Sequence, residues 1–181
     1  MKPSKMKELS DSDYVRIEKL SEEGNDLYEQ ENIRPALRKY EEALNIVPDP
    51  KTEWEASTWL YTSIADAHFS LGNIDEAKEN YYNALNCPDG LSNAYIHFSL
   101  GQVLYELEES KKSQESLLRA YMLEGLEIFE DEDPKYLDSI KGLIDEDIED
   151  KNIDTQIQQK YIYKNGSRFY KNEDGNLIED N

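Results

Sequence analysis

The sequence has only one cysteine, Cys87, among its 181 residues. A single cysteine excludes an internal disulfide and any zinc site made of several cysteines. No run of about 18 apolar residues occurs, which excludes a membrane-spanning helix. The first ten residues are polar and lack the apolar stretch of a secretory signal, so we expect the protein in the cytoplasm.

Positive charge is scarce as well. Twenty Lys and Arg residues stand against forty Asp and Glu residues, which gives a formal net charge of -20. Nucleic acids and anionic membranes would repel this charge, so neither is expected as a direct partner. The charge is expected either to attract a basic protein or to serve solubility alone. Thirteen tyrosines supply aromatic surface for a packed core, which argues against wholesale disorder.

Motifs of catalysis and cofactor binding are also lacking. The sequence has no glycine-rich phosphate loop, no nucleophile elbow and no His-x-x-x-His pair. His68 and His97 fall at packing positions of helices, and no charged neighbour activates Cys87. The acidic run at 145–150 lacks the glycine and the bidentate glutamate of a calcium loop. We therefore expect no enzyme activity, no metal and no cofactor.

What the sequence does contain is an internal repeat. Four columns of mostly small or aromatic residues keep the same two steps, 41 and then 36 residues. The columns are Gly24/Ala65/Gly101, Ala36/Ala77/Ser113, Tyr40/Tyr81/Leu117 and Ala43/Ala84/Ala120. Each unit has the periodicity of two amphipathic helices, in which the small residues let the helices approach and the tyrosines fill the space between adjacent pairs. Stacked pairs would bury a continuous core that no single unit could bury.

The repeats resemble the tetratricopeptide repeat family, whose unit is a helix–turn–helix of about 34 residues. The match covers residues 14–125 or so. The first unit has the signature residues Leu20, Gly24, Leu27, Ala36, Tyr40, Ala43 and Pro48. The second has Tyr61, Ile64, Ala65, Gly72, Ala77, Tyr81, Ala84 and, one place early, Pro88. The third is weaker, because Ser113 and Leu117 replace the usual alanine and aromatic residue.

Local signals predict where helices begin and end. Gly72 suits the left-handed position after a helix, and Asn32 and Asn73 are placed to cap the helices that follow them. Thr52 and Glu55 have the spacing of a capping box. The long first step places extra residues near 49–56, which we expect to lengthen a helix, and an apolar stripe predicts that the second helix of the third unit is long.

The predicted fold class is all-α: a solenoid of three helix–turn–helix repeats plus a C-terminal capping helix, followed by a small β-hairpin tail. The expected segments are a polar stretch at 1–13, the solenoid with its capping helix at 14–150, and a Tyr-rich tail at 151–181. Asp133 and Pro134 begin the capping helix. Aromatic residues alternate around Asn165-Gly166, which is a hairpin signal. The ribbon is expected to dock on the helices or to bind something, and the alternative is a partly ordered tail.

The resemblance implies that the first helix of each unit lines a concave groove that holds a partner. Its partner-binding residues would be Glu18, Asn25, Tyr28, Trp59, Asp66, Phe69, Tyr95, Phe98, Gln102 and Tyr105. Ser21, Thr62, Ser63 and Ser99 occupy further inward positions. The alternative for some of them, notably Trp59 and Phe98, is packing between neighbouring helix pairs.

Chaperone adaptors that resemble this family hold an acidic tail with a clamp of Lys, Asn and Arg. Asn25 fits this clamp, but Ser21, Tyr95 and Ser99 stand at its basic places. We therefore expect no binding of such a tail.

Two functions stay open. One is a short stand-alone bacterial-type protein that neutralises a basic cognate protein, such as a secreted toxin, as an immunity protein does. An acidic surface would steer the encounter, formed by Glu130, Asp131, Glu132, Asp145, Glu146 and Asp147. The alternative is a generic adaptor or scaffold that binds a peptide of an assembly or chaperone partner. The oligomeric state stays open.

Overall fold

A computed structural model describes residues 9–150, 162–164, 167–171 and 177–179, with side chains described through Ile144. By contacts the chain divides into two units, 1–130 and 131–181. The described residues of the first unit, 9–130, form six α-helices: α1 (Asp11–Glu29), α2 (Ile33–Ile46), α3 (Glu55–Ser70), α4 (Ile74–Leu85), α5 (Ala94–Glu106) and α6 (Ser110–Glu124). Three short 3₁₀ helices connect or follow them: η1 (Lys51–Glu53), η2 (Gly90–Ser92) and η3 (Gly125–Phe129). None of the helices described is long and apolar enough to cross a bilayer.

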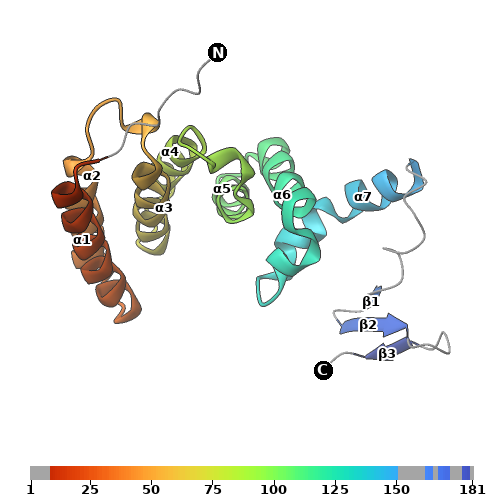
Figure 1. The fold of residues 1–181 in the computed structure, drawn as a ribbon. Helices are drawn as coiled ribbons and strands as arrows, with labels where there is room; N and C mark the ends of the chain where they lie inside the picture. Colours follow the sequence, from red (N-terminus) through yellow and green to blue (C-terminus); the bar gives the residue numbers. More distant parts are fainter. Residues whose placement is uncertain (1–8, 151–161, 165–166, 172–176, 180–181) are drawn as a thin grey trace, which may run out of the picture. The chain divides into compact units, whose positions relative to one another are not determined.

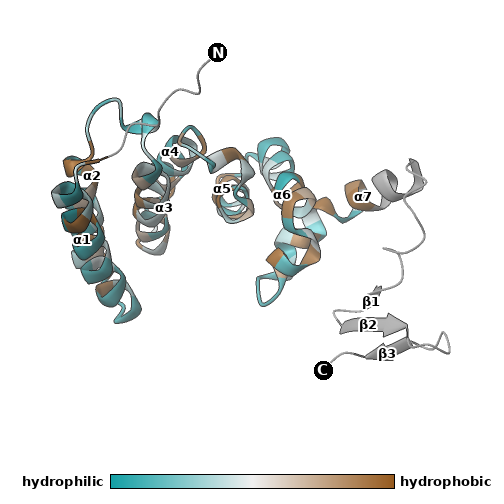
Figure 2. Cartoon of the chain, in the orientation of Figure 1, coloured by the Kyte–Doolittle hydropathy of each residue, from teal (hydrophilic) through white to brown (hydrophobic). Residues whose placement is uncertain are grey.

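The six helices form three antiparallel pairs, α1 with α2, α3 with α4 and α5 with α6, which stand in a row (Figure 1). Successive pairs also pack through α2 with α3 and α4 with α5. Each helix of this unit has hydrophobic residues on part of its surface and hydrophilic ones on the rest (Figure 2). The predicted stack of three helix pairs is therefore confirmed.

The small-residue column allows the two helices of a pair to touch. A Cβ added to Gly24 would lie 2.5 Å from Cε1 of Tyr40, and one added to Gly101 would lie 2.6 Å from Leu117. Ser113 takes the place of an alanine because its buried hydroxyl donates to the carbonyl of Gly101 at 2.8 Å. The buried hydroxyl of Ser113, which departs from the alanine of the other repeats, thus finds its hydrogen-bond partner within its own helix pair.

The core follows the predicted columns. One buried cluster contains Ala65, Ala77, Tyr81 and Ala84 together with α5 residues such as Leu100. Most residues of α5 are buried, whereas α1 buries three, because α5 has packed helices on both sides and α1 stands at the end of the row. Such a core depends on neighbouring repeats, as expected for a solenoid.

Several local predictions are wrong. The extra residues near 49–56 form a loop and η1 rather than a longer helix, since Pro48 and Pro50 keep this segment from continuing α2. Trp54 is the residue that caps α3, so Thr52 and Glu55 form no capping box. The α6 helix ends at Glu124 because Gly125 adopts a positive φ of 77°.

Asn32 and Asn73 are the N-cap residues of α2 and α4, so their predicted positions are confirmed. Neither Asn32 nor Asn73 makes a side-chain cap hydrogen bond. Asn93, which was not predicted, does so: its side chain accepts from the backbone N–H of Ile96 at 3.2 Å. The left-handed Gly72, with φ of 76°, is confirmed.

The second unit contains α7 (Pro134–Asp150) and the strands β1 (Ile162–Lys164), β2 (Ser167–Lys171) and β3 (Leu177–Glu179). Asp133 accepts from the backbone N–H of Lys135 at 3.0 Å, so the predicted helix start is confirmed. The strands pair antiparallel in the order β1-β2-β3, with Ile162 opposite Phe169. The predicted Asn165-Gly166 turn lies outside the described residues, and the hairpin tail stays a prediction. The division falls before α7 rather than after it, and the capping role of α7 also stays a prediction.

Candidate functional site

The residues predicted to bind a partner lie on the first helices of the three pairs, α1, α3 and α5. Five of the ten are exposed: Glu18, Asn25, Trp59, Tyr95 and Tyr105. Four are partly buried: Tyr28, Asp66, Phe69 and Gln102. We call the nine together with Thr62 and Ser63 the first-helix face.

Phe98 does not belong to this face. Its side chain is only 2% exposed, and its ring packs edge-on against Phe129 with 5.1 Å between the ring centroids. The prediction that Phe98 contacts a partner is therefore wrong, because α5 turns this position toward η3. Ser21 and Ser99 are buried too, so these inward positions present no surface either.

Interactions across the helices place the remaining residues on one side of the unit. At one end, Tyr14 of α1 hydrogen-bonds Glu18, and the negative charge of Glu55 of α3 helps to raise the pKa of Tyr14. At the other end, the hydroxyl of Tyr28 lies 2.6 Å from that of Ser70. A hydrogen bond thus joins α1 and α3 at one end of the face, and Tyr14 lies near Glu55 at the other end.

A tyrosine and an acceptor couple the two helices within each of the first two repeats. Tyr40 donates to Oδ1 of Asn25 at 2.9 Å, and Tyr81 donates to Oδ1 of Asp66 at 2.5 Å. The third repeat has Leu117 at the tyrosine position, so it lacks the hydroxyl that would make this bond. Asn25 and Asp66 therefore each join the two helices of their own repeat.

Asp66 is a partly buried carboxyl whose charge affects the pKa values of tyrosines around it. Burial raises the pKa of its carboxyl to about 6, while hydrogen bonds from Tyr81 and Tyr95 act to lower it. Burial also raises the pKa of Tyr40 to about 12, and Asp66 contributes to that shift. Tyr95 interacts with both Asp66 and Tyr28, so the charge of Asp66 reaches side chains of all three helix pairs.

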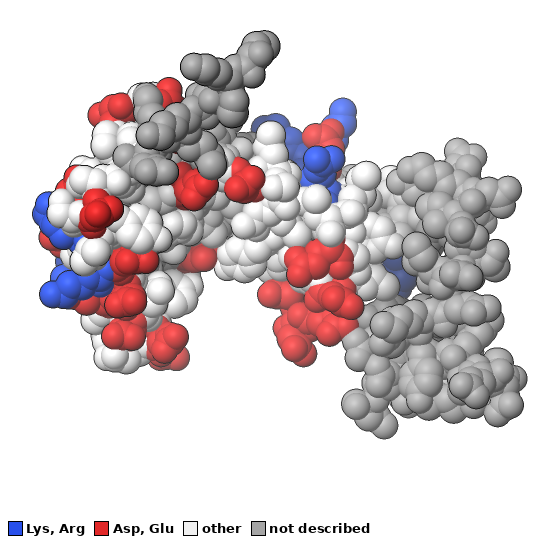
Figure 3. Space-filling view, viewed as in Figure 1, with Lys and Arg blue, Asp and Glu red and all other residues white. Residues whose placement is uncertain are grey.

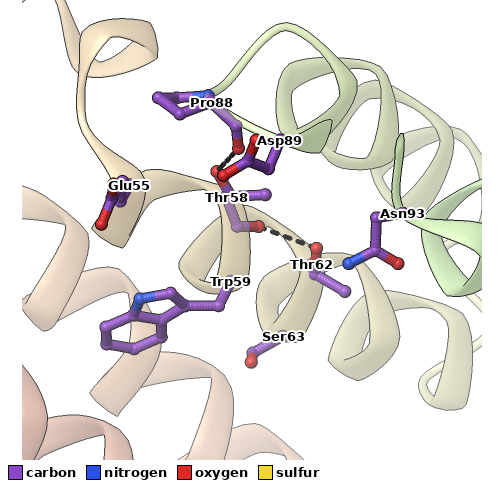
Figure 4. A pocket seen from close by; sticks show the side chains of 8 residues that line it. All are labelled: Glu55, Thr58, Trp59, Thr62, Ser63, Pro88, Asp89 and Asn93. Atoms are coloured by element: carbon purple, nitrogen blue, oxygen red, sulfur yellow. Dashed lines mark hydrogen bonds between the residues drawn. The ribbon is translucent and has the colours of Figure 1, made fainter. Parts of the chain in front are cut away.

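An open pocket of about 340 Å³ lies at the N-terminal half of α3 (Figure 4). Its lining residues are Glu55, Thr58, Trp59, Thr62, Ser63, Pro88, Asp89 and Asn93. The first five come from α3, and the other three come from the segment that leads into α5. Of these, the sequence predicted Trp59, Thr62 and Ser63.

The loop residues of this pocket were missed because the link between the second and third repeats has no counterpart to align with. The usable signal was Asn93, which stands three residues before Ile96 at the start of a helix, as an N-cap does. Asp89 adopts a positive φ of 59°, which Asp tolerates better than most residues.

A second pocket of about 360 Å³ is lined by Cys87, Asp89, Leu91, Ser92, Arg119 and Leu123. Burial raises the pKa of the Cys87 thiol to about 11, so the prediction of an unactivated cysteine is confirmed. His97 is buried beside the carbonyl of Leu91, 3.1 Å from Nε2, and burial lowers its pKa. This contact confirms a packing role for His97.

Within residues 9–144 no group of three or more His, Cys, Asp or Glu side chains could hold a metal ion. In Figure 3 acidic side chains gather near the end of α6. Of the predicted steering residues, Glu130, Asp131 and Glu132 are exposed. The side chains of Asp145, Glu146 and Asp147 lie outside those described, so the acidic surface as a whole stays a prediction.

Comparisons with known proteins bear on the fold. No protein-family model matches the chain. Human tetratricopeptide repeat protein 12 is 28% identical over 151 residues, which is 83% of this chain and 18% of that protein. This chain therefore spans about a fifth of that curated relative's length.

Solved structures resemble the chain at low sequence identity. The first TPR of Spaghetti (RPAP3), bound to the HSP90 peptide SRMEEVD, has a TM-score of 0.55 at 16% identity, over 74% of this chain and 94% of that one. The Arabidopsis OM64 TPR domain has a TM-score of 0.58 at 18% identity, over 74% and 98%. The Sgt2 TPR domain from Aspergillus fumigatus has a TM-score of 0.55 at 17% identity, over 84% and 95%.

Three stacked helix pairs with one shared face define a helical-repeat protein. Its fold is that of tetratricopeptide repeat domains, and the predicted resemblance to that family is confirmed by the curated relative and the solved structures.

Proposed function

We propose that the chain is a protein-binding module that holds a segment of another protein along the first-helix face. The observation that carries this proposal is the exposure of large aromatic side chains there: Trp59 is 37% exposed, Tyr95 50% and Tyr105 36%. Exposed aromatic residues beside polar ones are typical of the anchors of protein interfaces. The Spaghetti domain, which shares the fold, has a peptide bound in its structure, and this supports the same class of function.

The negative charge of the first-helix face argues against an acidic partner segment. Glu18, Glu55 and Asp66 lie on it or beside it, and the uncharged Ser21, Tyr95 and Ser99 stand where a clamp for an acidic tail would need cations. The peptide SRMEEVD has three acidic side chains. We expect no saturable binding of this peptide in fluorescence anisotropy, since like charges repel at close range. Saturable binding would favour the chaperone-adaptor alternative.

The proposal is tested by substitution of the anchors. The double variant Trp59→Ala with Tyr105→Ala is expected to lose a partner captured by the wild-type chain from its native host, with affinity about tenfold lower or worse, because truncation of aromatic anchors commonly costs that much. The matched control is Tyr82→Ala with Met122→Ala, two exposed apolar residues on second helices. Equal capture by both double variants would overturn the proposal, provided both melt within a few degrees of wild type.

A narrower form of the proposal is the inhibition of a basic protein such as a secreted toxin. The support for it is the net charge of -20 and the exposed Glu130, Asp131 and Glu132. Charge steering would make the association rate of the captured partner fall steeply between low and high salt in surface plasmon resonance. An association rate independent of salt, or a partner without basic character, would leave the adaptor form.

A further inference from the structure

The pocket beside Trp59 has walls held by their own hydrogen bonds. The hydroxyl of Thr58 donates to the carbonyl of Pro88 at 2.7 Å, and the hydroxyl of Thr62 donates to the carbonyl of Thr58 at 2.8 Å (Figure 4). Asn93 is fixed as well, since its Oδ1 caps α5 by accepting from Ile96. The pocket is therefore preformed, which lowers the entropy cost of filling it.

These bonds decide what the pocket offers to a ligand. Both threonine hydroxyls already donate their protons to backbone carbonyls, so toward a ligand their oxygens can only accept hydrogen bonds. Glu55 and Asp89 add two exposed carboxylates, which accept hydrogen bonds and carry negative charge. Acceptors thus outnumber donors among the lining side chains, and none of the eight is Lys or Arg.

The remaining wall is the indole of Trp59, which is partly exposed at the pocket. The face of an indole attracts a cation more strongly than other aromatic rings do. A guanidinium group is planar, stacks on aromatic faces and donates several hydrogen bonds at once. An aromatic wall, two carboxylates and hydroxyl acceptors therefore match arginine better than they match any acidic or apolar side chain.

We propose that this pocket binds an arginine side chain of the partner segment, with the guanidinium against Trp59 and its N–H groups toward Glu55 and Asp89. This inference rests on the proposed function, because the arginine is the partner's. It assigns a charge preference and a position to one part of the first-helix face.

The test uses the fluorescence of Trp59 in the full chain. The chain has two tryptophans, and Trp54→Phe leaves Trp59 as the sole indole. The indole N–H of Trp54 is buried without a hydrogen-bond partner, so this substitution removes no hydrogen bond. The probes are an acetylated and amidated heptapeptide of glycine and serine with a central arginine, and its twin with citrulline, which has nearly the same shape but no charge.

The arginine peptide is expected to change the Trp59 emission saturably at low salt, and the citrulline peptide is expected to bind about tenfold more weakly, since it lacks the cation–π and charge-assisted terms. Glu55→Gln with Asp89→Asn should remove this preference. Asn also tolerates the positive φ at position 89. The control Glu76→Gln with Glu79→Gln removes the same charge from exposed positions of α4 and should keep the preference.

Equal responses to the two peptides would overturn the inference. So would equal loss in the pocket variant and the α4 control, because that result means attraction by net charge alone. If the melting temperature of the double variant falls, the single variant Glu55→Gln replaces it, because that variant leaves the loop at Asp89 unchanged. If the pocket fails this test while Trp59→Ala with Tyr105→Ala still loses the captured partner, the proposed function stands and only the arginine is wrong.

Discussion

Asn25 and Asp66 occupy the same place in successive repeats, and each accepts a hydrogen bond from the tyrosine fifteen residues later. The two differ in charge, and only the carboxylate is penalised by partial burial. The same repeat position therefore holds an amide in the first repeat and a carboxylate in the second. This internal comparison predicts what happens when one replaces the other.

Asp66→Asn is expected to stabilise the protein at pH 7 by about 3 kcal/mol, since burial raises the pKa of Asp66 by about two units and each unit is worth about 1.4 kcal/mol. The folded pKa of about 6 lies above the unfolded value of about 3.9, so the folded state holds the extra proton between these values. The wild type therefore gains stability from this group as pH falls from about 6 to about 4, and the variant does not. Urea unfolding at several pH values measures the difference.

The control for this prediction is Asp26→Asn, which removes the same charge from an exposed position of α1. It should leave the pH dependence as in the wild type. A less stable Asp66→Asn at pH 7 would mean that the hydrogen bonds from Tyr81 and Tyr95 outweigh the cost of burial.

Gly24→Ala is expected to destabilise the first repeat by about 1–3 kcal/mol, the usual cost of overpacking. The new Cβ would lie 2.5 Å from the ring of Tyr40, which its bond to Asn25 holds in place. Gly142→Ala in α7 is the matched control, because a Cβ there meets nothing within 4 Å. The control should be neutral or slightly stabilising by thermal melting, through helix propensity alone. A Gly24→Ala variant as stable as its parent would show that Tyr40 can move aside.

At the scale of the elements, the start of α5 depends on one side chain. Asn93→Ala removes the bond to the backbone N–H of Ile96 and is expected to cost about 1 kcal/mol in urea unfolding. Asn32→Ala, at the cap position of α2 but without a side-chain bond, should cost much less. Similar losses in the two variants would show that the capping bond at Asn93 contributes little.

At the scale of the whole molecule, the excess of acidic residues sets the response to salt. A net charge of -20 repels itself in the compact state, and salt screens that repulsion. The ion pairs that salt would weaken are largely exposed, such as Lys19 with Glu23, and such pairs contribute little. The melting temperature followed by circular dichroism is therefore expected to rise between about 10 mM and about 500 mM sodium chloride. A falling melting temperature would contradict this expectation.

Features that depend on residues close together in the sequence could be predicted, whereas contacts between distant residues could not. The repeat columns were enough to predict three helix pairs, because small residues that recur at fixed spacing within amphipathic helices are typical of close helix packing. The same columns placed Trp59, Tyr95 and Tyr105 on the first helices. Phe98 could not be placed, since its contact with Phe129 lies thirty-one positions away in the chain and depends on the path of η3.

The sequence by itself determined the repeat, its helix pairs and the excess of negative charge, since periodicity and composition act through neighbouring residues and through their sum. Only the tertiary structure decided that Asp66 lies between Tyr81 and Tyr95, and that Asp89 and Asn93 complete a pocket beside Trp59. Burial and hydrogen bonding are properties of side chains brought together by packing, and a loop without a counterpart in the repeat has no spacing that reports where it will lie.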